Sequence, residues 1–227
     1  MSFYALFKKR IRDIILFQEK SGQQSDTIRK RRRNASGMMV YLDNSATTRQ
    51  YDIVTEAMGA MMREEFGNPS SLHRMGMKAE QRVKEARGSV AAGLYARPEE
   101  VFFTGSGTES DNTALFGAAE ARRRKGNRII TSRIEHPAVL EACKKLEKNG
   151  FQLTYIDVDR KGQIDREELA QHLSDDVILV SVMAVNNELG TVEPITEIAG
   201  LVKAKTEALF HTDAVQAFGK IPLFPER

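Results

Sequence analysis

The sequence is poor in several features that would each have pointed to a class of protein. It contains a single cysteine, Cys143, and no tryptophan. A lone cysteine excludes an internal disulfide framework and a zinc site built from several cysteines, and it fits a reducing, cytoplasmic compartment. No apolar run approaches the ~20 residues of a membrane-spanning helix, which argues against an integral membrane protein. The 41% hydrophobic and 29% charged residues predict a globular protein rather than a disordered one.

Charge is divided unevenly along the chain. Residues 1–38 carry 10 Lys and Arg against 3 Asp and Glu, a balance of +7, whereas the other 24 basic and 28 acidic residues give −4. The basic character therefore belongs to an N-terminal arm, residues 1–38. The body, residues 39–227, is mildly acidic and offers no general attraction to nucleic acid.

The arm has two interpretations. Apolar residues at helical spacing in 3–17 alternate with basic ones, and residues 29–33 are all basic. A basic amphipathic helix can lie on an anionic membrane surface and a basic run can touch nucleic acid, so the arm could be a tether. We favour the other interpretation, a disordered or partly helical tail, or translated sequence upstream of a start at Met38 or Met39.

In the body, strand-like and helix-like patterns alternate. A short extended segment at 40–43 leads into a turn at 44–46, and a loop is expected at 67–71. The expected strands are 101–104 (short and buried), 128–132, 152–157, 177–183 and 209–212. The expected helices are 54–62, 76–94, 107–124, 137–148, 165–173 and 193–205. This alternation predicts an α/β fold with a mostly parallel sheet flanked by helices.

Ligands of such sheets bind beyond the carboxyl ends of the strands, so the residues that follow each strand are the informative ones. After the first expected strand comes Gly105-Ser106-Gly107-Thr108. Glycines let the backbone approach a ligand, and the N-terminus of the following helix offers free N–H groups to a phosphate. The motif is neither a Walker loop nor a dinucleotide fingerprint, and a tight strand-to-helix connection is its other interpretation.

Two further strand ends carry side chains that suit a planar ligand. His136 precedes Pro137, a residue typical of a first helical turn, so its imidazole is expected at the ligand edge, where it can stack on a ring or move protons. The other interpretation is a capping or structural histidine. After strand 177–183, Asn186 and Asn187 can donate hydrogen bonds to a ligand or simply build the turn.

Asp213 directly follows the last expected strand, 209–212, and Gln216 is three residues further on. An aspartate in this buried position is costly unless it faces a cation or a strong donor. A protonated pyridine nitrogen is such a partner, and Gln216 could reach a substituent of the same ring. A phosphate cradle, a stacking imidazole, amide donors and an anion for a ring nitrogen are together the contacts that pyridoxal phosphate (PLP) needs.

The motifs at these strand ends resemble those of the cysteine desulfurase family, class V of the PLP-dependent aminotransferases, over residues 40 to about 223. They are YLDNSATT (41–48), FGNPSS (66–71), FTGSGTESDN (103–112), EH (135–136), VNNELG (185–190) and DAVQ (213–216). The resemblance implies a type I PLP-dependent transferase fold, with a large α/β domain and a smaller one built from both chain ends. It also implies that the enzyme removes sulfur from L-cysteine and releases alanine. The sulfur would pass as a persulfide to a sulfur-acceptor protein for iron–sulfur cluster or thio-cofactor synthesis. The complete enzyme is expected to be a homodimer.

The resemblance assigns roles to individual residues. Gly107 and Thr108 match the pair that binds the phosphate. His136 matches the histidine stacked on the pyridine ring, also an acid/base candidate, and Asp213 matches the partner of the ring nitrogen. Asn187 and Gln216 match contacts on the side of the ring hydroxyl. No metal is implied.

Two departures accompany these matches. The family's Schiff-base lysine stands in a Ser-x-His-Lys motif downstream of the aspartate, which does not occur in the 227 residues, and Lys220 matches a different family position. The persulfide-bearing cysteine also lies in the later part, and we interpret Cys143 as a core thiol. We therefore expect the N-terminal portion of a desulfurase, incomplete at its C-terminus and inactive alone, in which 101–104 lacks the later strand that pairs with it in the family.

Other functions remain open from the sequence. A different class V reaction, such as selenocysteine lyase activity or amino-group transfer, would use the same residues. A non-catalytic truncated or partner chain is a further alternative. Residues 157–168 resemble a calcium-binding loop, but Lys161 stands where an oxygen ligand is needed and a strand is expected where an entering helix is required, so calcium binding is not expected.

Overall fold

The computed structural model describes residues 40–223. The chain divides into two compact units, Met1–Asn44 and Ser45–Arg227. Of the first unit only 40–44 are described, where the Asn44 side chain donates to the Tyr41 carbonyl (3.2 Å) in the expected turn. The basic arm lies outside the described residues, so its interpretations remain predictions.

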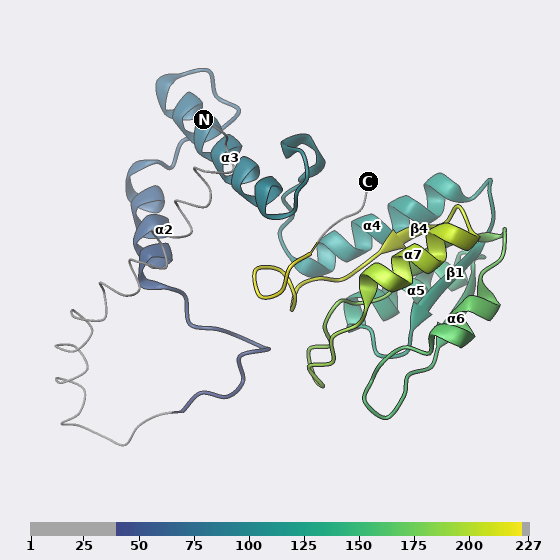
Figure 1. Cartoon of the computed structure of the whole chain (residues 1–227). Helices are drawn as coiled ribbons and strands as arrows, with labels where there is room; N and C mark the ends of the chain where they lie inside the picture. The colour runs from purple at the N-terminus through teal and green to yellow at the C-terminus, as the bar shows by residue number, and fades with distance from the viewer. Residues whose placement is uncertain (1–39, 224–227) are drawn as a thin grey trace, which may run out of the picture. The chain divides into compact units, whose positions relative to one another are not determined.

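Four parallel strands form the sheet of the second unit (Figure 1). They are β1 (Arg128–Ser132), β2 (Gln152–Ile156), β3 (Val177–Ser181) and β4 (Leu209–His211), in the order β2-β1-β3-β4. The register aligns Ser132 with Ile156, and Ser181 with His211, so the carboxyl ends of neighbouring strands meet at one edge. The predicted α/β fold with a parallel sheet is therefore confirmed.

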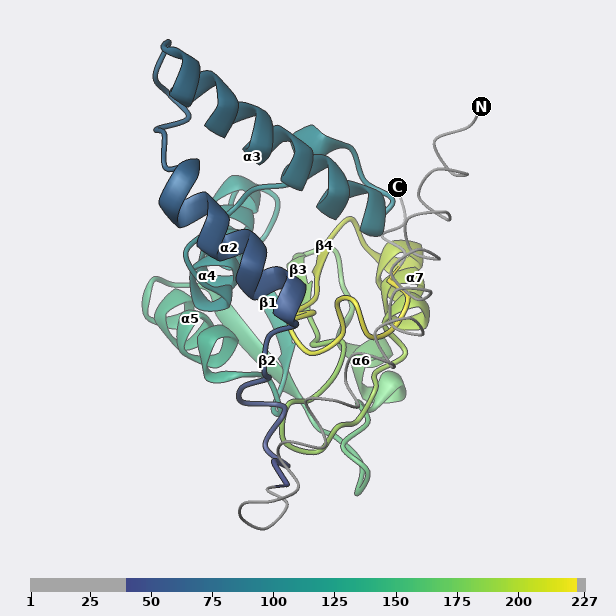
Figure 2. The same ribbon diagram turned by 90° about the vertical axis from the view of Figure 1, so that its left-hand side faces the viewer.

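Helices cover both faces of this sheet (Figure 2). α4 (Gly107–Arg122) and α5 (Pro137–Lys148) lie on one face, and α6 (Arg166–His172) and α7 (Ile195–Lys205) lie on the other. Successive strand residues serve opposite faces because side chains alternate: Ile129 packs into the core under α4 and α5, and Ile130 into the core under α6 and α7. The expected Cys143 core thiol is confirmed, since Cys143 is fully buried in the first of these cores.

Helices α2 (Asp52–Glu64) and α3 (Arg74–Gly93) precede the sheet in the sequence. Ion pairs link the end of α2 to α3: the carboxylate of Glu65, the residue after α2, contacts Lys78 (2.9 Å) and Arg82 (2.8 Å) of α3. The expected loop at 67–71 packs tightly on α3, since a Cβ on Gly76 would stand 2.1 Å from the Ser71 carbonyl oxygen. In residues 40–223, no helix has both the length and the apolar character needed to cross a membrane.

The prediction of a buried strand at 101–104 is wrong. These residues follow a short 3-10 helix, η1 (Pro98–Glu100), and have no regular secondary structure. Phe102 is 82% exposed and Phe103 51% exposed. A short apolar run becomes a strand only by pairing, and within residues 40–223 no strand pairs with it. The Val101 carbonyl instead accepts a bond from Arg87 Nε (3.2 Å).

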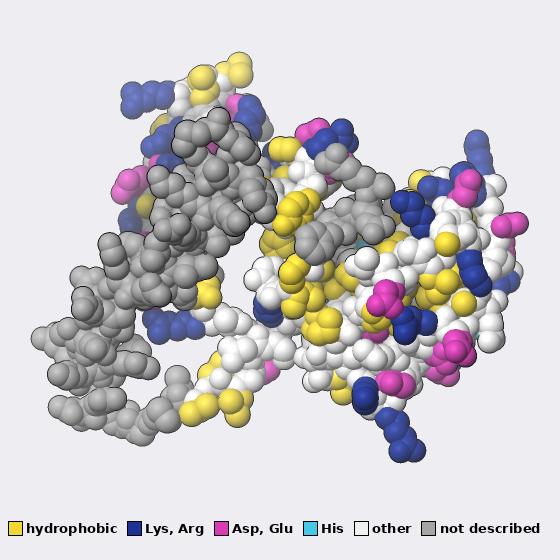
Figure 3. All heavy atoms as spheres, viewed as in Figure 1, with side chains coloured by type: hydrophobic (Ala, Val, Ile, Leu, Met, Phe, Trp, Pro, Cys, Tyr) yellow, Lys and Arg dark blue, Asp and Glu magenta, His cyan; other side chains and the backbone are white. Residues whose placement is uncertain are grey.

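The calcium-like loop has a local structural role. It follows strand β2, and the Asp159 carboxylate accepts bonds from its own loop, from the N–H groups of Lys161 (2.8 Å) and Gln163 (2.9 Å). Asp165 caps α6 by accepting from the N–H groups of Glu167 and Glu168. Acidic and basic side chains intersperse over α6 and α7 on the face shown in Figure 3.

Candidate active site

The glycine-containing turn ends in a well-formed helix N-terminus. α4 begins at Gly107, and the Ser106 side chain caps it by accepting from Glu109 N–H (3.2 Å). The Glu109 carboxylate reaches back to Gly105 N–H (2.6 Å), which fixes the turn. Gly107 and Thr108 occupy the first two helical positions, whose N–H groups have no partner within a helix, and both are exposed. This end of α4 therefore suits an anion.

A second chain segment lies against this helix N-terminus. A Cβ placed on Gly107 would come within 3.2 Å of Val215 Cγ2, two residues after Asp213. Asn112, one turn after Thr108, donates to the Thr108 carbonyl (2.8 Å) and to the Ala138 carbonyl (3.5 Å), in the first turn of α5. The phosphate-binding candidates therefore adjoin both the α5 N-terminus and the segment after β4.

His136 is the N-cap of α5. Its Nδ1 accepts a bond from Ala138 N–H (3.1 Å), and Pro137 starts the helix. The interpretation of His136 as a capping residue is therefore correct for Nδ1. The histidine is nevertheless exposed at the strand-end edge, which leaves Nε2 and the ring faces available to a ligand. The two interpretations are compatible.

Asp213 is buried, with 8% of its surface exposed, and its Oδ1 accepts from Val215 N–H (2.9 Å). Its backbone carbonyl accepts from Ala184 N–H (2.9 Å), which continues the pairing beyond β3 and β4. Gln216 is half-buried, and its amide is engaged by the Ser45 carbonyl (2.8 Å) and Lys220 Nζ (3.1 Å). Its expected contact with a ring therefore stays a prediction.

The two asparagines after β3 have different surroundings. Asn186 builds the turn: its Nδ2 donates to the Ile134 carbonyl (2.9 Å), and its Oδ1 accepts from the N–H groups of Glu188 and Leu189. Asn187 is half-buried and takes no part in these bonds. Turn-building thus belongs to Asn186, which leaves the amide of Asn187 as the candidate for a ligand.

Glu135 is an important residue to which the sequence analysis assigned no role. Only 4% of it is exposed, and its Oε1 accepts from Ser132 Oγ (2.7 Å) and Met183 N–H (2.8 Å). Burial raises the pKa of Glu135 to about 8, and the nearby Asp213 and Asp111 carboxyls act in the same direction. The sequence carries no signal that separates Glu135 from Arg133, a charged residue nearer the same strand that is exposed.

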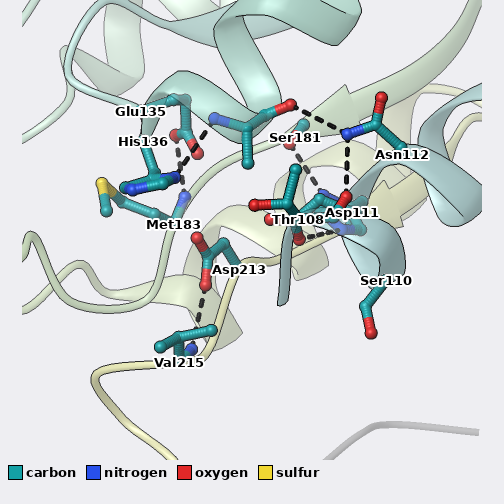
Figure 4. Close-up of polar contacts among 12 residues, drawn as sticks. Thr108, Ser110, Asp111, Asn112, Glu135, His136, Ser181, Met183, Asp213 and Val215 are labelled. Atoms are coloured by element: carbon teal, nitrogen blue, oxygen red, sulfur yellow. Dashed lines mark hydrogen bonds and ion pairs between the residues drawn. The ribbon is translucent and has the colours of Figure 1, made fainter. Parts of the chain in front are cut away.

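A second polar group that the sequence analysis did not assign joins β3, β4 and α4. Ser181 Oγ is 2.8 Å from His211 Nδ1, and His211 Nε2 is 3.6 Å from Asp111 Oδ1. Asp111 is one turn beyond Gly107, and His211 is two residues before Asp213. The pair therefore links α4, which begins with the phosphate-binding candidates, to β4, which precedes Asp213. Figure 4 shows Ser181 and Asp111 of this group together with Glu135 and Asp213.

The structure thus brings together Gly107, Thr108, His136 and Asp213 at one edge of the sheet. Hollows of about 460 Å³ and about 1070 Å³ lie elsewhere, at residues 157–166 and along α5, and neither is lined by a predicted site residue. The candidate site combines a buried carboxyl acceptor, Asp213, with backbone N–H donors at the start of α4. This donor set fits a phosphate joined to a nitrogen heterocycle.

Comparison with known proteins places this site in a family. The family description "Aminotransferase class-V" matches residues 40–225. The chain belongs to this family. The resemblance stated from the strand-end motifs is thereby confirmed, and enzymes of the class-V aminotransferase family depend on PLP.

Relatives within the class-V family carry a more specific name. The cysteine desulfurase IscS of Methanosarcina thermophila is 49% identical over 184 residues, which are 81% of this chain and 45% of that protein. The cysteine desulfurase IscS of Dictyoglomus turgidum is 48% identical over 81% of this chain and 46% of its own. This chain spans about half the length of the curated relatives it matches.

Solved structures agree. A NifS-like protein superposes with a TM-score of 0.81 and 46% identity over 84% of this chain and 52% of its own. SspA in complex with cysteine superposes with a TM-score of 0.77 and 36% identity over 82% of this chain and 53% of its own. The fold of this class-V chain is therefore that of the NifS-like PLP enzymes.

Proposed function

We propose that this chain forms part of a PLP-dependent cysteine desulfurase. The reaction converts L-cysteine and an acceptor thiol into alanine and a persulfide, so the C–S bond of the substrate breaks and an S–S bond forms on the acceptor. The observation that carries the proposal is the meeting of the α4 N-terminus, His136 and buried Asp213 at one sheet edge, in a chain about 48% identical to cysteine desulfurases. A sulfur-acceptor protein, a homodimer and a cytoplasmic location remain predictions.

Each residue of the site has a defined task in this proposal. The N–H groups of Gly107 and Thr108 would bind the phosphate of PLP, and the Asp213 carboxylate would hold a proton at the ring nitrogen. His136 would lie against the ring and move a proton through Nε2, since its Nδ1 is occupied by the helix cap. When bound, PLP supplies an electron sink for the substrate carbon that bears the amino group.

A neighbouring structure supports cysteine as the substrate class. The solved structure of SspA, 36% identical to this chain, contains cysteine. Selenocysteine lyase and aminotransferase reactions of the same family are the competing functions. They differ in product rather than in the residues described here, so the products decide between them.

The proposal is tested with an extended protein, in which this chain is joined to the second half of a cysteine desulfurase relative. With PLP and L-cysteine, we expect alanine and sulfide in equal amounts when a thiol reductant is present. Transfer of the amino group to an oxo acid, or activity with selenocysteine alone, would favour one of the competing reactions. If neither the extended protein nor the chain itself binds PLP in an absorbance titration, the proposal is wrong.

His136 gives a second test, because two substitutions separate capping from chemistry. His136→Asn keeps a side-chain acceptor for the helix N-terminus, whereas His136→Ala removes it and should cost about 1 kcal/mol of unfolding free energy. We expect H136N to unfold near the wild-type temperature but to lower turnover of the extended protein by about 100-fold, the low end for a general acid or base. Wild-type turnover in H136N would leave His136 with the capping role alone.

A further inference from the structure

Glu135 joins the ends of the two central strands. It follows β1 by three residues, and its Oε1 accepts one bond from Ser132 at the end of β1 and one from Met183 N–H, just after β3. Its Oε2 is completely buried and has no hydrogen-bond partner within residues 40–223. A carboxylate in this position would leave one charged oxygen without a donor, which is among the costliest arrangements in a protein interior.

The groups that face Glu135 do not supply a compensating charge. Asp213 after β4 and Asp111 of α4 are both buried acids, and Cys143 of α5 is a buried thiol. Figure 4 shows the Glu135 and Asp213 side chains facing the same space. The nearest histidines are otherwise engaged, since His211 faces Asp111 and His136 caps α5. Within residues 40–223, no lysine or arginine forms an ion pair with Glu135.

We propose that Glu135 is a positioning residue of the cofactor site: a neutral carboxylic acid that clasps β1 to β3 and leaves the negative charge to Asp213. A neutral acid removes the uncompensated charge: Oε1 still accepts both bonds and Oε2 carries the proton. That O–H has no acceptor within residues 40–223, but an unpaired neutral group costs far less than an unpaired buried charge. The same clasp holds His136, the next residue along the chain. The part of this inference that concerns PLP rests on the proposed function, but the protonation of Glu135 can be measured without the cofactor.

The pH dependence follows from linkage. Burial raises the pKa of Glu135 from 4.5 to about 8, so between these pH values the folded chain holds a proton that the unfolded chain has lost. Unfolding therefore releases a proton in this window, and stability falls as the pH rises through it and levels off above it. For one group, the folding equilibrium constant falls by up to about tenfold per pH unit.

The first experiment compares wild type and Glu135→Gln by urea unfolding from pH 5 to 9. Gln keeps the shape and the acceptor oxygen but does not titrate. The folding equilibrium constant of the wild type, relative to that of E135Q, should therefore fall by close to tenfold per pH unit. This fall should stop near the pH at which Glu135 titrates in the folded chain. Glu141→Gln is the matched control, an exposed glutamate on α5, and it should leave the wild-type pH profile unchanged. A constant difference between wild type and E135Q across this range would overturn the proposal.

The second experiment observes the proton directly. Infrared spectra at pH 7 should show a neutral carboxylic acid in the wild type that is missing in E135Q. If E135Q does not fold, the wild-type band and its titration midpoint still decide. In Asp213→Asn the midpoint should move down, because a neighbouring negative charge is removed. Absence of the band, or an unchanged midpoint in D213N, would contradict the inference.

PLP supplies the last comparison. A cationic ring nitrogen placed at Asp213 should also lower the pH at which Glu135 titrates. This shift is read from the infrared band, so no turnover has to be measured. If neither the chain nor the extended protein binds PLP while the acid band and the D213N shift are present, the proposed function is wrong and the neutral clasp stands. If PLP binds and the band is absent, the clasp is wrong and the proposed function stands.

Discussion

Removing the charge of Asp213 should reduce turnover of the extended protein by about 100-fold or more. Losing one member of a buried ion pair costs roughly 3 kcal/mol, and the ring nitrogen of bound PLP would lose the anion that keeps it protonated. Asp213→Asn is the sharper variant, because an amide oxygen can still accept the bond from Val215 N–H. Asp213→Ala should lose activity and some stability together. The measurement is alanine production from L-cysteine, with PLP affinity recorded in parallel.

Asp157 provides the matched control for this substitution. It also follows a strand of the same sheet, β2, but it is exposed and pairs with Arg133 on the surface. Asp157→Asn should leave turnover near the wild-type value, since an exposed ion pair contributes little. Wild-type turnover in D213N would remove Asp213 from the proposed mechanism.

Gly126→Ala should lower the unfolding free energy of the chain by about 2–3 kcal/mol. A Cβ at this position would stand 2.2 Å from the Asp176 carbonyl oxygen and 2.7 Å from its carbonyl carbon. Both atoms belong to the backbone of Asp176, the residue directly before β3. The same Asp176 carbonyl accepts a bond from Arg128 N–H (3.1 Å) at the start of β1. Relief of the clash must therefore separate two central strands, a form of overpacking that is costly. Urea unfolding followed by circular dichroism measures the change.

Gly117→Ala is the contrasting substitution. Gly117 lies in α4, and a Cβ there would have nothing within 4 Å. Because alanine favours the helix and reduces the freedom of the unfolded chain, G117A should raise the unfolding free energy by up to about 1 kcal/mol. Equal effects of G126A and G117A would mean that the close approach at Asp176 does not constrain the sheet.

Local patterns were sufficient to predict most of the elements. The expected strand at 128–132 and helix at 137–148 are β1 and α5 with the same bounds, because apolar residues followed by a proline-led amphipathic stretch specify both locally. The segment 101–104 has an equally apolar pattern and is not a strand. Its state depends on pairing with distant residues, which periodicity does not encode.

The candidate site was predictable where a residue type has few uses in its position. A glycine at a helix start and an aspartate at a strand end are such cases, and Gly107 and Asp213 lie at the same edge. Glu135 and the His211–Asp111 pair were not predicted, because their roles come from burial and from contacts across 48 and 100 residues of sequence. Gln216 is the opposite case, a residue that was predicted to contact a ligand. In the structure its amide contacts Ser45 and Lys220, and its position in the sequence indicated neither partner.

The strand order β2-β1-β3-β4 has a consequence for where a ring can enter the molecule. From β1 the chain turns to α5 on one face, whereas from the end of β3 it runs to α7 on the opposite face. The strand order thus reverses between β1 and β3, and in sheets of this kind the diverging connections at such a topological switch point form the ligand crevice. Glu135 accepts bonds from Ser132 at the end of β1 and from Met183 just after β3, so one carboxyl side chain ties together the two strand ends from which these connections diverge.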